Sequence, residues 1–135
     1  MATERTVRGD WKGGWLCEVT AGDFTLIVDE PEEVPLGTNQ GPQPTELLLA
    51  SVASCFSLAL AYAAMKRSIE LSHIVVDATG VYDGPSFSSI RVDAELDCSD
   101  ADLDRLLEAA ERVCYVTNTL RGGPVVTISG SVVSG

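Results

Sequence analysis

The apolar run from Glu46 to Met65 constrains the fold of this chain of 135 residues more than any other segment. Pro44 suits a first helical turn, Glu46 favours the positive end of the helix dipole, and Lys66 with Arg67 favours the negative end. We therefore predict one helix of about 23 residues, with Cys55 near its middle. Because the helix is apolar nearly all round, it needs cover on every side. We expect a homodimer that encloses it.

The same run is long enough to cross a membrane, so a transmembrane helix is the alternative to a core helix. The run is rich in Ala and Ser, it begins with Glu46, and segments with strand patterns lie on both sides of it. No second apolar run of this length follows. We therefore interpret it as a buried core helix of a protein that does not enter the membrane.

The charge of the chain excludes several partners. Its 20 acidic residues outnumber its 9 Lys and Arg, and the formal net charge is -11. This balance argues against binding to nucleic acid or to anionic membrane surfaces. The first residues, Met1 to Arg5, lack the layout of a signal peptide, so we expect a cytoplasmic protein whose four cysteines rest as thiols. The length predicts a single domain covering residues 1–135.

Shorter periodic segments predict a mixed α+β fold around the long helix. Three strand candidates at 3–11, 14–20 and 24–29 predict an N-terminal meander. Residues 30–43, rich in Pro and Gly, form a loop of a length that is more often functional than idle. Alternating apolar residues predict a β-hairpin, with one buried face, from two strands at 73–82 and 88–98 joined by a turn at 83–86.

A second helix and a last strand complete the predicted order of elements. Ser99 has the character of an N-cap, with Asp102 three residues later. The apolar residues that follow recur at helical spacing as far as Cys114, which places this cysteine on the core side of an amphipathic helix. After Gly122, Gly123 and Pro124, residues 125–133 predict a final strand.

The residue types leave cysteine chemistry as the main functional signal. The four cysteines form no C-x-x-C pair and His73 is the only histidine, so neither a metal site nor a Cys-His nucleophile is expected. The chain has neither a phosphate-binding glycine loop nor a serine hydrolase elbow. We predict no bound cofactor. Cys17 and Cys98, on the inward faces of strands, are interpreted as small apolar residues.

A reactive Cys55 needs help from a cation. A free thiol is only about 3% ionised at pH 7, and burial among apolar side chains lowers that fraction further. The middle of a helix lies outside the reach of the helix dipole. A guanidinium or ammonium group close to Cys55 is therefore required for reactivity.

The segments around two of the cysteines resemble a known family. Residues 41–55 read Gly-Pro-Gln-Pro-Thr-Glu-Leu-Leu-Leu-Ala-Ser-Val-Ala-Ser-Cys, and residues 113–120 read Val-Cys-Tyr-Val-Thr-Asn-Thr-Leu. They resemble the first and second cysteine motifs of the OsmC/Ohr family, the osmotically inducible and organic hydroperoxide resistance proteins. The order of predicted elements also agrees, and the resemblance covers nearly the whole chain.

The resemblance implies an OsmC-like fold, an intertwined homodimer with active sites at the subunit interface, and thiol peroxidase activity in oxidative stress defence. Cys55 would attack the peroxide and become a sulfenic acid. Cys114 would resolve that species as a disulfide, which a small dithiol or a dithiol protein would reduce. Organic hydroperoxides are the expected substrates, because an apolar surround favours an apolar tail.

The acidic residue of the family's first motif is displaced in this sequence. The peroxidase members carry it ten positions before the cysteine, where this chain has Thr45. Glu46 lies nine positions before Cys55, and on a straight helix it would face the opposite side. Glu46 is therefore either a catalytic residue or a residue that serves only the helix N-terminus.

The activating arginine and a proline of the family also differ. The loop at 30–43 contains no basic residue, so Arg8, Lys12 and Arg121 are the candidates for activating Cys55. Tyr115 stands where the peroxidase branches place a proline after the second cysteine. These differences favour the broader OsmC-like branch.

Two other functions remain open on the same scaffold. One is a non-catalytic module that binds an apolar ligand, with Cys55 acting only in packing. The other is a redox sensor in which a disulfide changes the shape presented to a partner.

Overall fold

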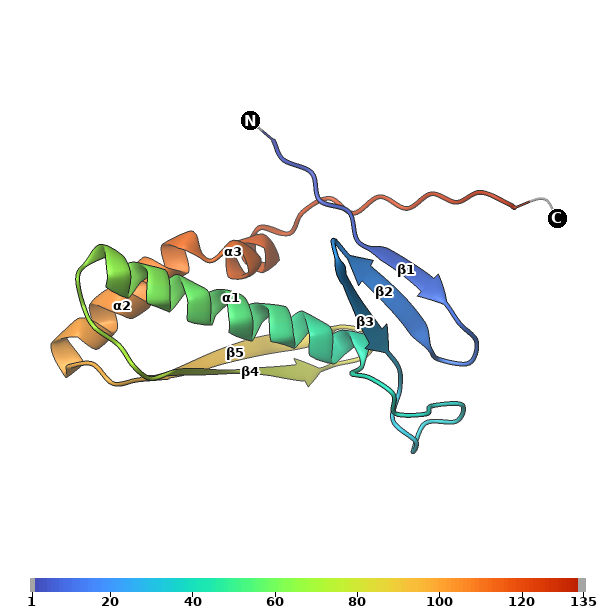
Figure 1. Ribbon diagram of the computed structural model, residues 1–135, viewed down its shortest axis with the longest axis horizontal. Coiled ribbons are helices and arrows are strands. Elements are labelled where there is room, and N and C mark those ends of the chain that lie inside the picture. Colours follow the sequence, from blue (N-terminus) through green and yellow to red (C-terminus); the bar gives the residue numbers. More distant parts are fainter. Residues whose placement is uncertain (1, 134–135) are drawn as a thin grey trace. The chain divides into compact units, whose positions relative to one another are not determined.

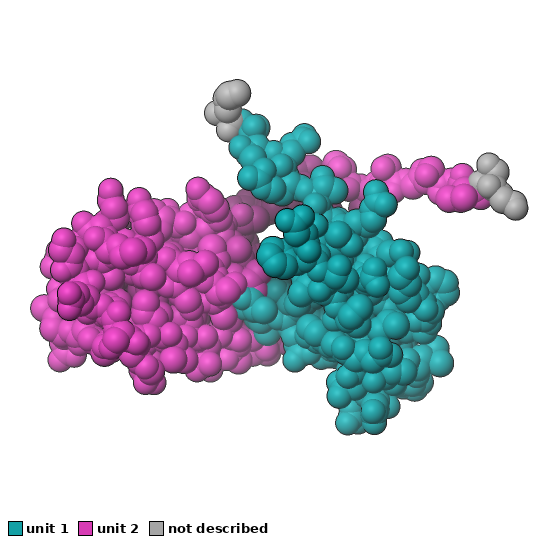
Figure 2. Space-filling view, viewed as in Figure 1, with its two compact units in different colours: residues 1–50 teal, residues 51–135 magenta. Residues whose placement is uncertain are grey.

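The computed structural model describes residues 2–133 of the chain. The chain forms two compact units, Met1–Ala50 and Ser51–Gly135, which have different colours in Figure 2. That one domain contains both units stays a prediction. The elements in chain order are three strands, a long helix, two strands and two further helices, which is the predicted α+β class (Figure 1).

The first unit contains the predicted meander. It is an antiparallel sheet in the order β1-β2-β3, and each turn contains glycine with a positive φ, such as Gly22 at 61°. Such turns suit glycine because a side chain would clash in the left-handed region. The strands are β1 (Arg8–Trp11), β2 (Cys17–Ala21) and β3 (Phe24–Val28).

Asp29 organises the loop that follows β3. Its side chain is buried, and its carboxylate accepts hydrogen bonds from the backbone N–H groups of Glu30, Thr38 and Gln40 and from the Thr38 hydroxyl. The Thr38 hydroxyl contributes most, and together these donors hold the pKa of Asp29 below its ordinary value against the opposing effect of burial. A loop without regular structure is therefore held in place by one carboxylate.

Helix α1 (Pro44–Lys66) has the predicted 23 residues. At its start the Glu46 carboxylate accepts a hydrogen bond of 2.9 Å from the Gln43 backbone N–H, which is one half of a capping box. Its length and composition would suffice to cross a membrane. Its buried residues recur at helical spacing and form one face of the helix: Val52, Phe56, Ala59, Leu60, Ala63 and Ala64.

The long helix is covered only in part within one chain, and the expected homodimer that would enclose it stays a prediction. Leu58 and Met65 are 71% and 70% exposed, and Tyr62 is 50% exposed. The reason is that the second unit covers α1 on one side only. The apolar residues on its other side face solvent in the single chain.

In the second unit, strands β4 (Ile74–Tyr82) and β5 (Phe87–Leu96) form the predicted antiparallel hairpin. Exposed and partly buried residues alternate along β5, as the sequence predicts. The inward side chains pack against a core formed by the buried face of α1 and by α2; they are Ile74, Val76, Val92, Ala94 and Leu96.

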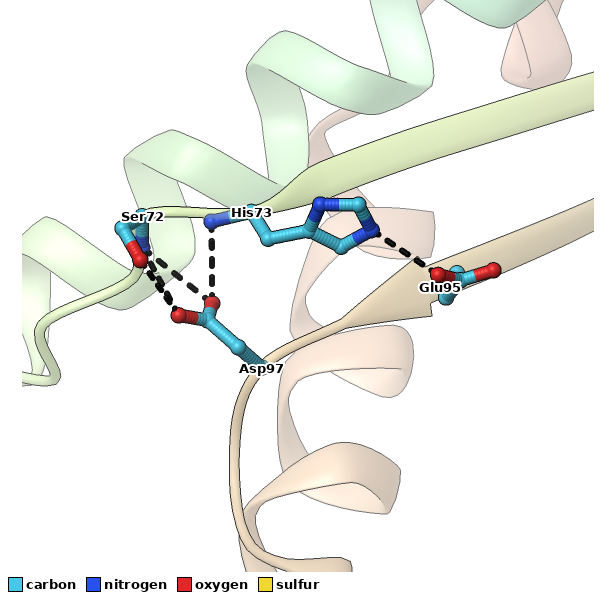
Figure 3. A network of polar contacts seen from close by, with 4 residues as sticks. All are labelled: Ser72, His73, Glu95 and Asp97. Atoms are coloured by element: carbon cyan, nitrogen blue, oxygen red, sulfur yellow. Dashed lines mark hydrogen bonds and ion pairs between the residues drawn. The ribbon is translucent and has the colours of Figure 1, made fainter.

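A polar cluster closes the open end of this hairpin (Figure 3). The Asp97 carboxylate accepts hydrogen bonds from the Ser72 hydroxyl and from the backbone N–H groups of Ser72 and His73. These donors, the Ser72 hydroxyl first, hold the pKa of Asp97 below its ordinary value. His73 Nε2 lies 2.9 Å from Glu95 Oε1 on the neighbouring strand. We call these four residues the Asp97 cluster.

Helix α2 (Asp100–Val113) begins as predicted, because the Ser99 hydroxyl accepts a hydrogen bond of 3.2 Å from the Asp102 backbone N–H. It ends one residue before Cys114, whose backbone is extended. A further helix that the sequence did not predict, α3 (Tyr115–Gly122), starts immediately afterwards. Gly123 ends it in the left-handed conformation with φ of 59°.

The last predicted strand is not formed. Residues 124–133 leave the helices of the second unit as an extended segment (Figure 1), and they pair with no other strand among residues 2–133. Val125 and Ile128 are 90% and 94% exposed. The sequence has the residues of a strand, but a strand also needs a neighbour that accepts and donates hydrogen bonds, and the described chain supplies none.

Candidate functional site

Cys55 lies in the second unit, near the middle of α1. It is partly buried, it packs against the core, and the buried Phe56 follows it in the chain. The helix fixes the direction of its side chain, because residues at helical spacing before and after it are buried. Cys55 thus combines a rigid backbone with partial access to solvent.

Cys114 lies at the junction of α2 and α3 and is completely buried. Asn118 stabilises this junction from both sides: its side-chain amide donates to the Arg112 carbonyl at 3.3 Å, and its backbone N–H donates to the Cys114 carbonyl at 3.0 Å. The Asn118 side chain therefore caps the end of α2, while its backbone N–H bonds to the residue that precedes α3. Because the helix breaks here, Cys114 is the N-cap of α3 and not a residue inside α2.

Cys55 and Cys114 are free thiols, and Cys55 packs against the core cluster that contains Cys114. Burial raises the pKa of Cys114, but the Thr117 hydroxyl, the Thr117 backbone N–H, the Cys55 thiol and the Val116 backbone N–H act in the opposite direction and outweigh it. The pKa of Cys114 is therefore lowered. The Cys114 side chain makes no capping hydrogen bond to the first turn of α3. Donors at the start of a helix stabilise a thiolate there.

A small cavity of about 170 Å³ in the second unit is lined by residues of α1, β5, α2 and α3. Its apolar lining comes from Phe56, Val92 and Leu107, and its polar lining from Glu111, Thr117 and Arg121. Arg121 Nη2 lies 3.7 Å from Glu111 Oε1, and both side chains are mostly exposed. The cavity thus combines apolar walls with one hydroxyl and one ion pair.

The second unit contains three of the predicted site residues: the two cysteines share one core cluster, and Arg121 lines the small cavity. Glu46, Arg8 and Lys12 belong to the first unit. Glu46 is bonded to the Gln43 N–H, Lys12 Nζ forms an ion pair of 2.8 Å with Asp10, and Arg8 is exposed on β1. Their roles in catalysis stay predictions.

The sequence analysis missed Thr117, Glu111 and Phe56 as site residues. Thr117 lies three positions after Cys114, which is the spacing between an N-cap residue and the third residue of its helix. The sequence pattern instead predicts that Cys114 ends one amphipathic helix. The sequence signal for this start is the polar segment Thr117 to Thr119, which begins three positions after the cysteine. Residues with helix-capping side chains at that point favour a new helix start.

Comparison with known proteins identifies a family for this chain. The sequence profile of the OsmC-like protein family matches residues 37–129, which include both cysteines and the second half of the loop at 30–43. The chain belongs to the OsmC-like family. A protein of unknown function from Haloferax volcanii is 32% identical over 112 residues, covering 80% of each chain.

Solved structures share the fold. The crystal structure of an OsmC-like protein from Mycoplasma pneumoniae has a TM-score of 0.80 at 17% identity, with 91% of each chain covered. An organic hydroperoxide resistance protein from Vibrio cholerae, with captopril bound in one of its active sites, has a TM-score of 0.71 at 26% identity. That match covers 91% of this chain and 89% of the other. The family predicted from the two cysteine segments is therefore confirmed.

Proposed function

We propose that this protein is a thiol peroxidase that reduces organic hydroperoxides with Cys55 and Cys114. The observation that carries the proposal is the position of both thiols at one core cluster, where Cys55 packs against the group of residues that includes the buried Cys114. The Cys55 thiol is also one of the groups that lower the pKa of Cys114. A disulfide between them requires Cα atoms roughly 4.4 to 6.8 Å apart. Family membership and the relative from Vibrio cholerae, assigned to organic hydroperoxide resistance, support the same reaction.

The reaction begins at Cys55, which is the more accessible thiol. Its thiolate attacks the outer oxygen of the hydroperoxide, the O–O bond breaks, and the alkoxide leaves and takes a proton to become an alcohol. Cys55 is thereby oxidised by two electrons to a sulfenic acid. The apolar walls at Phe56, Val92 and Leu107 favour an organic peroxide, whose hydrocarbon part gains by leaving water.

Cys114 completes the oxidative half of the cycle. Its thiolate attacks the Cys55 sulfur, the S–O bond breaks, and hydroxide leaves and is protonated to water. The product is a Cys55–Cys114 disulfide, which an external dithiol reduces by exchange while it becomes a disulfide itself. Over one cycle the hydroperoxide and the dithiol become an alcohol, water and an oxidised dithiol.

The cation that assists Cys55 is assigned in the same proposal. We assign this role to Arg121, because it is the predicted candidate in the same unit as Cys55 and lines a cavity with Phe56, the residue after Cys55. Its guanidinium is paired with Glu111 at 3.7 Å. Arg8 and Lys12 stay the alternatives from the first unit.

The exposed apolar residues support a homodimer. Leu58, Tyr62 and Met65 lie exposed on α1, and residues 125–133 are an apolar, strand-like segment without a partner strand in the described chain. Proteins that function as monomers rarely expose large apolar patches. A second copy of the chain would cover α1 and pair with the extended segment. Sedimentation of the wild type as a dimer, and of Leu58→Glu as a monomer, is the expected result.

The peroxidase proposal is tested with purified full-length protein, cumene hydroperoxide and dithiothreitol. We expect catalytic loss of peroxide with wild type and none above background with Cys55→Ser. Cys98→Ser is the matched control, because Cys98 also packs against the core but has no place in the reaction. Full turnover by Cys55→Ser would exclude the proposal and would favour the ligand-binding alternative.

A further inference from the structure

A second small pocket, of about 130 Å³, is lined by residues near the ends of α1 and α2 in the second unit. Its polar lining comes from Tyr62 and from three cationic side chains, Lys66, Arg67 and Arg112. Its apolar lining consists of short side chains: Ala63, Ala109 and Val113. The chain has 9 Lys and Arg against 20 acidic residues, so these three are a third of its cations. We call this site the basic pocket.

The fold uses the cations of the basic pocket only in part. Arg67 follows α1, and its Nη1 donates to the Ala63 carbonyl at 3.1 Å. Arg112 Nη1 lies 3.1 Å from Glu108 Oε1. A guanidinium carries five N–H donors, so both arginines keep donors for another group. The Lys66 ammonium forms no hydrogen bond or ion pair with any residue among 2–133. All three cations can therefore bind an anion without breaking a contact of the fold.

Charges at this end of α1 are separated by sign. A larger pocket, lined by Met65, residues 68–72 and Asp97, contains two carboxylates and, among the described residues, no Lys or Arg. The basic pocket has the opposite character, since none of the described residues that line it is acidic. Helix dipoles favour a cation near the end of each helix, but cations that share one pocket repel one another. An anion between them would remove that repulsion.

The size and the donors of the basic pocket suit a phosphate group. Its volume of about 130 Å³ compares with roughly 30 Å³ for one water in the liquid, so a group of about five heavy atoms fits and a nucleotide does not. The planar fork of arginine binds two phosphate oxygens at once, and lysine adds a compact point charge. Three cations also match the nearly double negative charge of a phosphate group better than the single charge of a carboxylate.

We propose that the basic pocket binds the phosphate group of a small anionic molecule through Lys66, Arg67 and Arg112. The group is either inorganic phosphate or the head of a small phosphate ester. The three cations are exposed, so the rest of an ester would extend from the pocket into solvent. Neither Cys55 nor Cys114 lines the pocket, and the inference does not depend on the proposed peroxidase reaction.

The test measures phosphate binding to the purified full-length protein by isothermal titration calorimetry, with chloride added to keep the ionic strength constant. We expect saturable binding by wild type, weakened about tenfold in Lys66→Met and in Arg112→Met, because each variant loses a charged donor. Arg91→Met is the matched control. Arg91 also pairs with one exposed carboxylate, but it lies on β5 and outside the pocket. The same loss of charge there should change the affinity by less than about twofold.

A variant that strengthens binding separates a phosphate site from a purely structural role. Glu108→Gln removes the carboxylate that competes for Arg112, and it should raise the affinity for phosphate by about threefold. Glycerol 3-phosphate distinguishes the two sources of the group. Tighter binding than that of inorganic phosphate assigns the pocket to an ester, and equal or weaker binding assigns it to free phosphate.

Three results would each overturn the proposal: no saturable phosphate binding by wild type, acetate binding as tightly as phosphate, or equal weakening in Arg91→Met and Lys66→Met. Circular dichroism of every variant checks that the fold is kept. Cys55→Ser should bind phosphate as wild type does, so a failure of the peroxidase proposal and a failure of the phosphate site are recognised separately.

Discussion

Two polar clusters in the second unit contain the same kinds of hydrogen-bond donor, but these donors have different roles. Around Cys114, the Thr117 hydroxyl and the backbone N–H groups of two consecutive residues, Val116 and Thr117, lower the pKa of a thiol. In the Asp97 cluster, a serine hydroxyl and the N–H groups of Ser72 and His73 are directed at a carboxylate (Figure 3). Both arrangements lower the pKa of the group that accepts.

The difference between the clusters is access to water. Asp97 is exposed, and a carboxyl group in water is ionised at neutral pH with or without extra donors, so its hydrogen bonds serve to close the hairpin. Cys114 is buried, and a buried thiol without donors stays protonated. The same donors are therefore structural where water reaches them and decide the chemistry where water is excluded.

The variant with the largest expected effect removes the buried thiol of Cys114. Cys114→Ser should lower steady-state peroxide reduction on the order of 10³-fold, because the Cys55 sulfenic acid would have no thiol to resolve it. One equivalent of peroxide should still be consumed, and dimedone should label Cys55, as detected by mass spectrometry. Asp97→Asn is the control in the exposed cluster and should keep its turnover. Undiminished turnover by Cys114→Ser would contradict a resolving role.

Two leucines of α1 allow the effect of burial on stability to be measured at nearly the same position in the sequence. Leu60 is fully buried and Leu58 is 71% exposed, two residues apart on one helix. Leu60→Ala should lower the free energy of unfolding by about 2–5 kcal/mol, as measured by urea denaturation. In a monomer Leu58→Ala should change it by less than about 0.5 kcal/mol. A larger, concentration-dependent effect of Leu58→Ala is expected if the proposed dimer covers this face.

The Arg121 ion pair offers a smaller test of which cation assists Cys55. The pair with Glu111 is exposed, and such pairs contribute roughly 0–1 kcal/mol to stability, so its removal should leave the fold intact. Arg121→Met should slow the reaction of Cys55 with peroxide by about tenfold in single-turnover measurements. Arg8→Met and Lys12→Met are the matched controls from the first unit. Slowing by one of these, with Arg121→Met unaffected, would move the assignment.

The elements whose apolar or capping residues recur at a regular spacing could be predicted from the sequence. The elements that depend on pairing with another segment could not. The helix from Pro44 to Lys66, the hairpin and the Ser99 cap each follow from local pattern, because their signals lie within the element. Residues 125–133 have a strand pattern, but pairing depends on another segment. The break at Cys114 was hidden because this cysteine continues the apolar face of α2.

The same distinction between local signals and long-range packing applies to the residues of the candidate site. The two cysteine segments predicted the family, because a motif is local. That Cys55 packs against the cluster containing Cys114 depends on how α1 and α2 pack together, which no local pattern contains. Thr117 was missed for a further reason: its hydroxyl donates to the Cys114 carbonyl at the start of a helix that begins at Tyr115, and the sequence did not predict that start.

The smallest expected effect is on stability at the Asp97 cluster, and it is recognised by its dependence on pH. The folded pKa of Asp97 is below its ordinary value, so its ionised form stabilises the fold above about pH 4 and this contribution is lost as pH falls through the lower, folded pKa. Asp97→Asn should therefore be less stable than wild type at neutral pH, and the two urea midpoints should converge toward acid pH. Peroxide turnover should not follow this change. A shift in turnover with Asp97→Asn at neutral pH would mean that the hairpin end acts on the thiol pair and that exposure alone does not separate the two clusters.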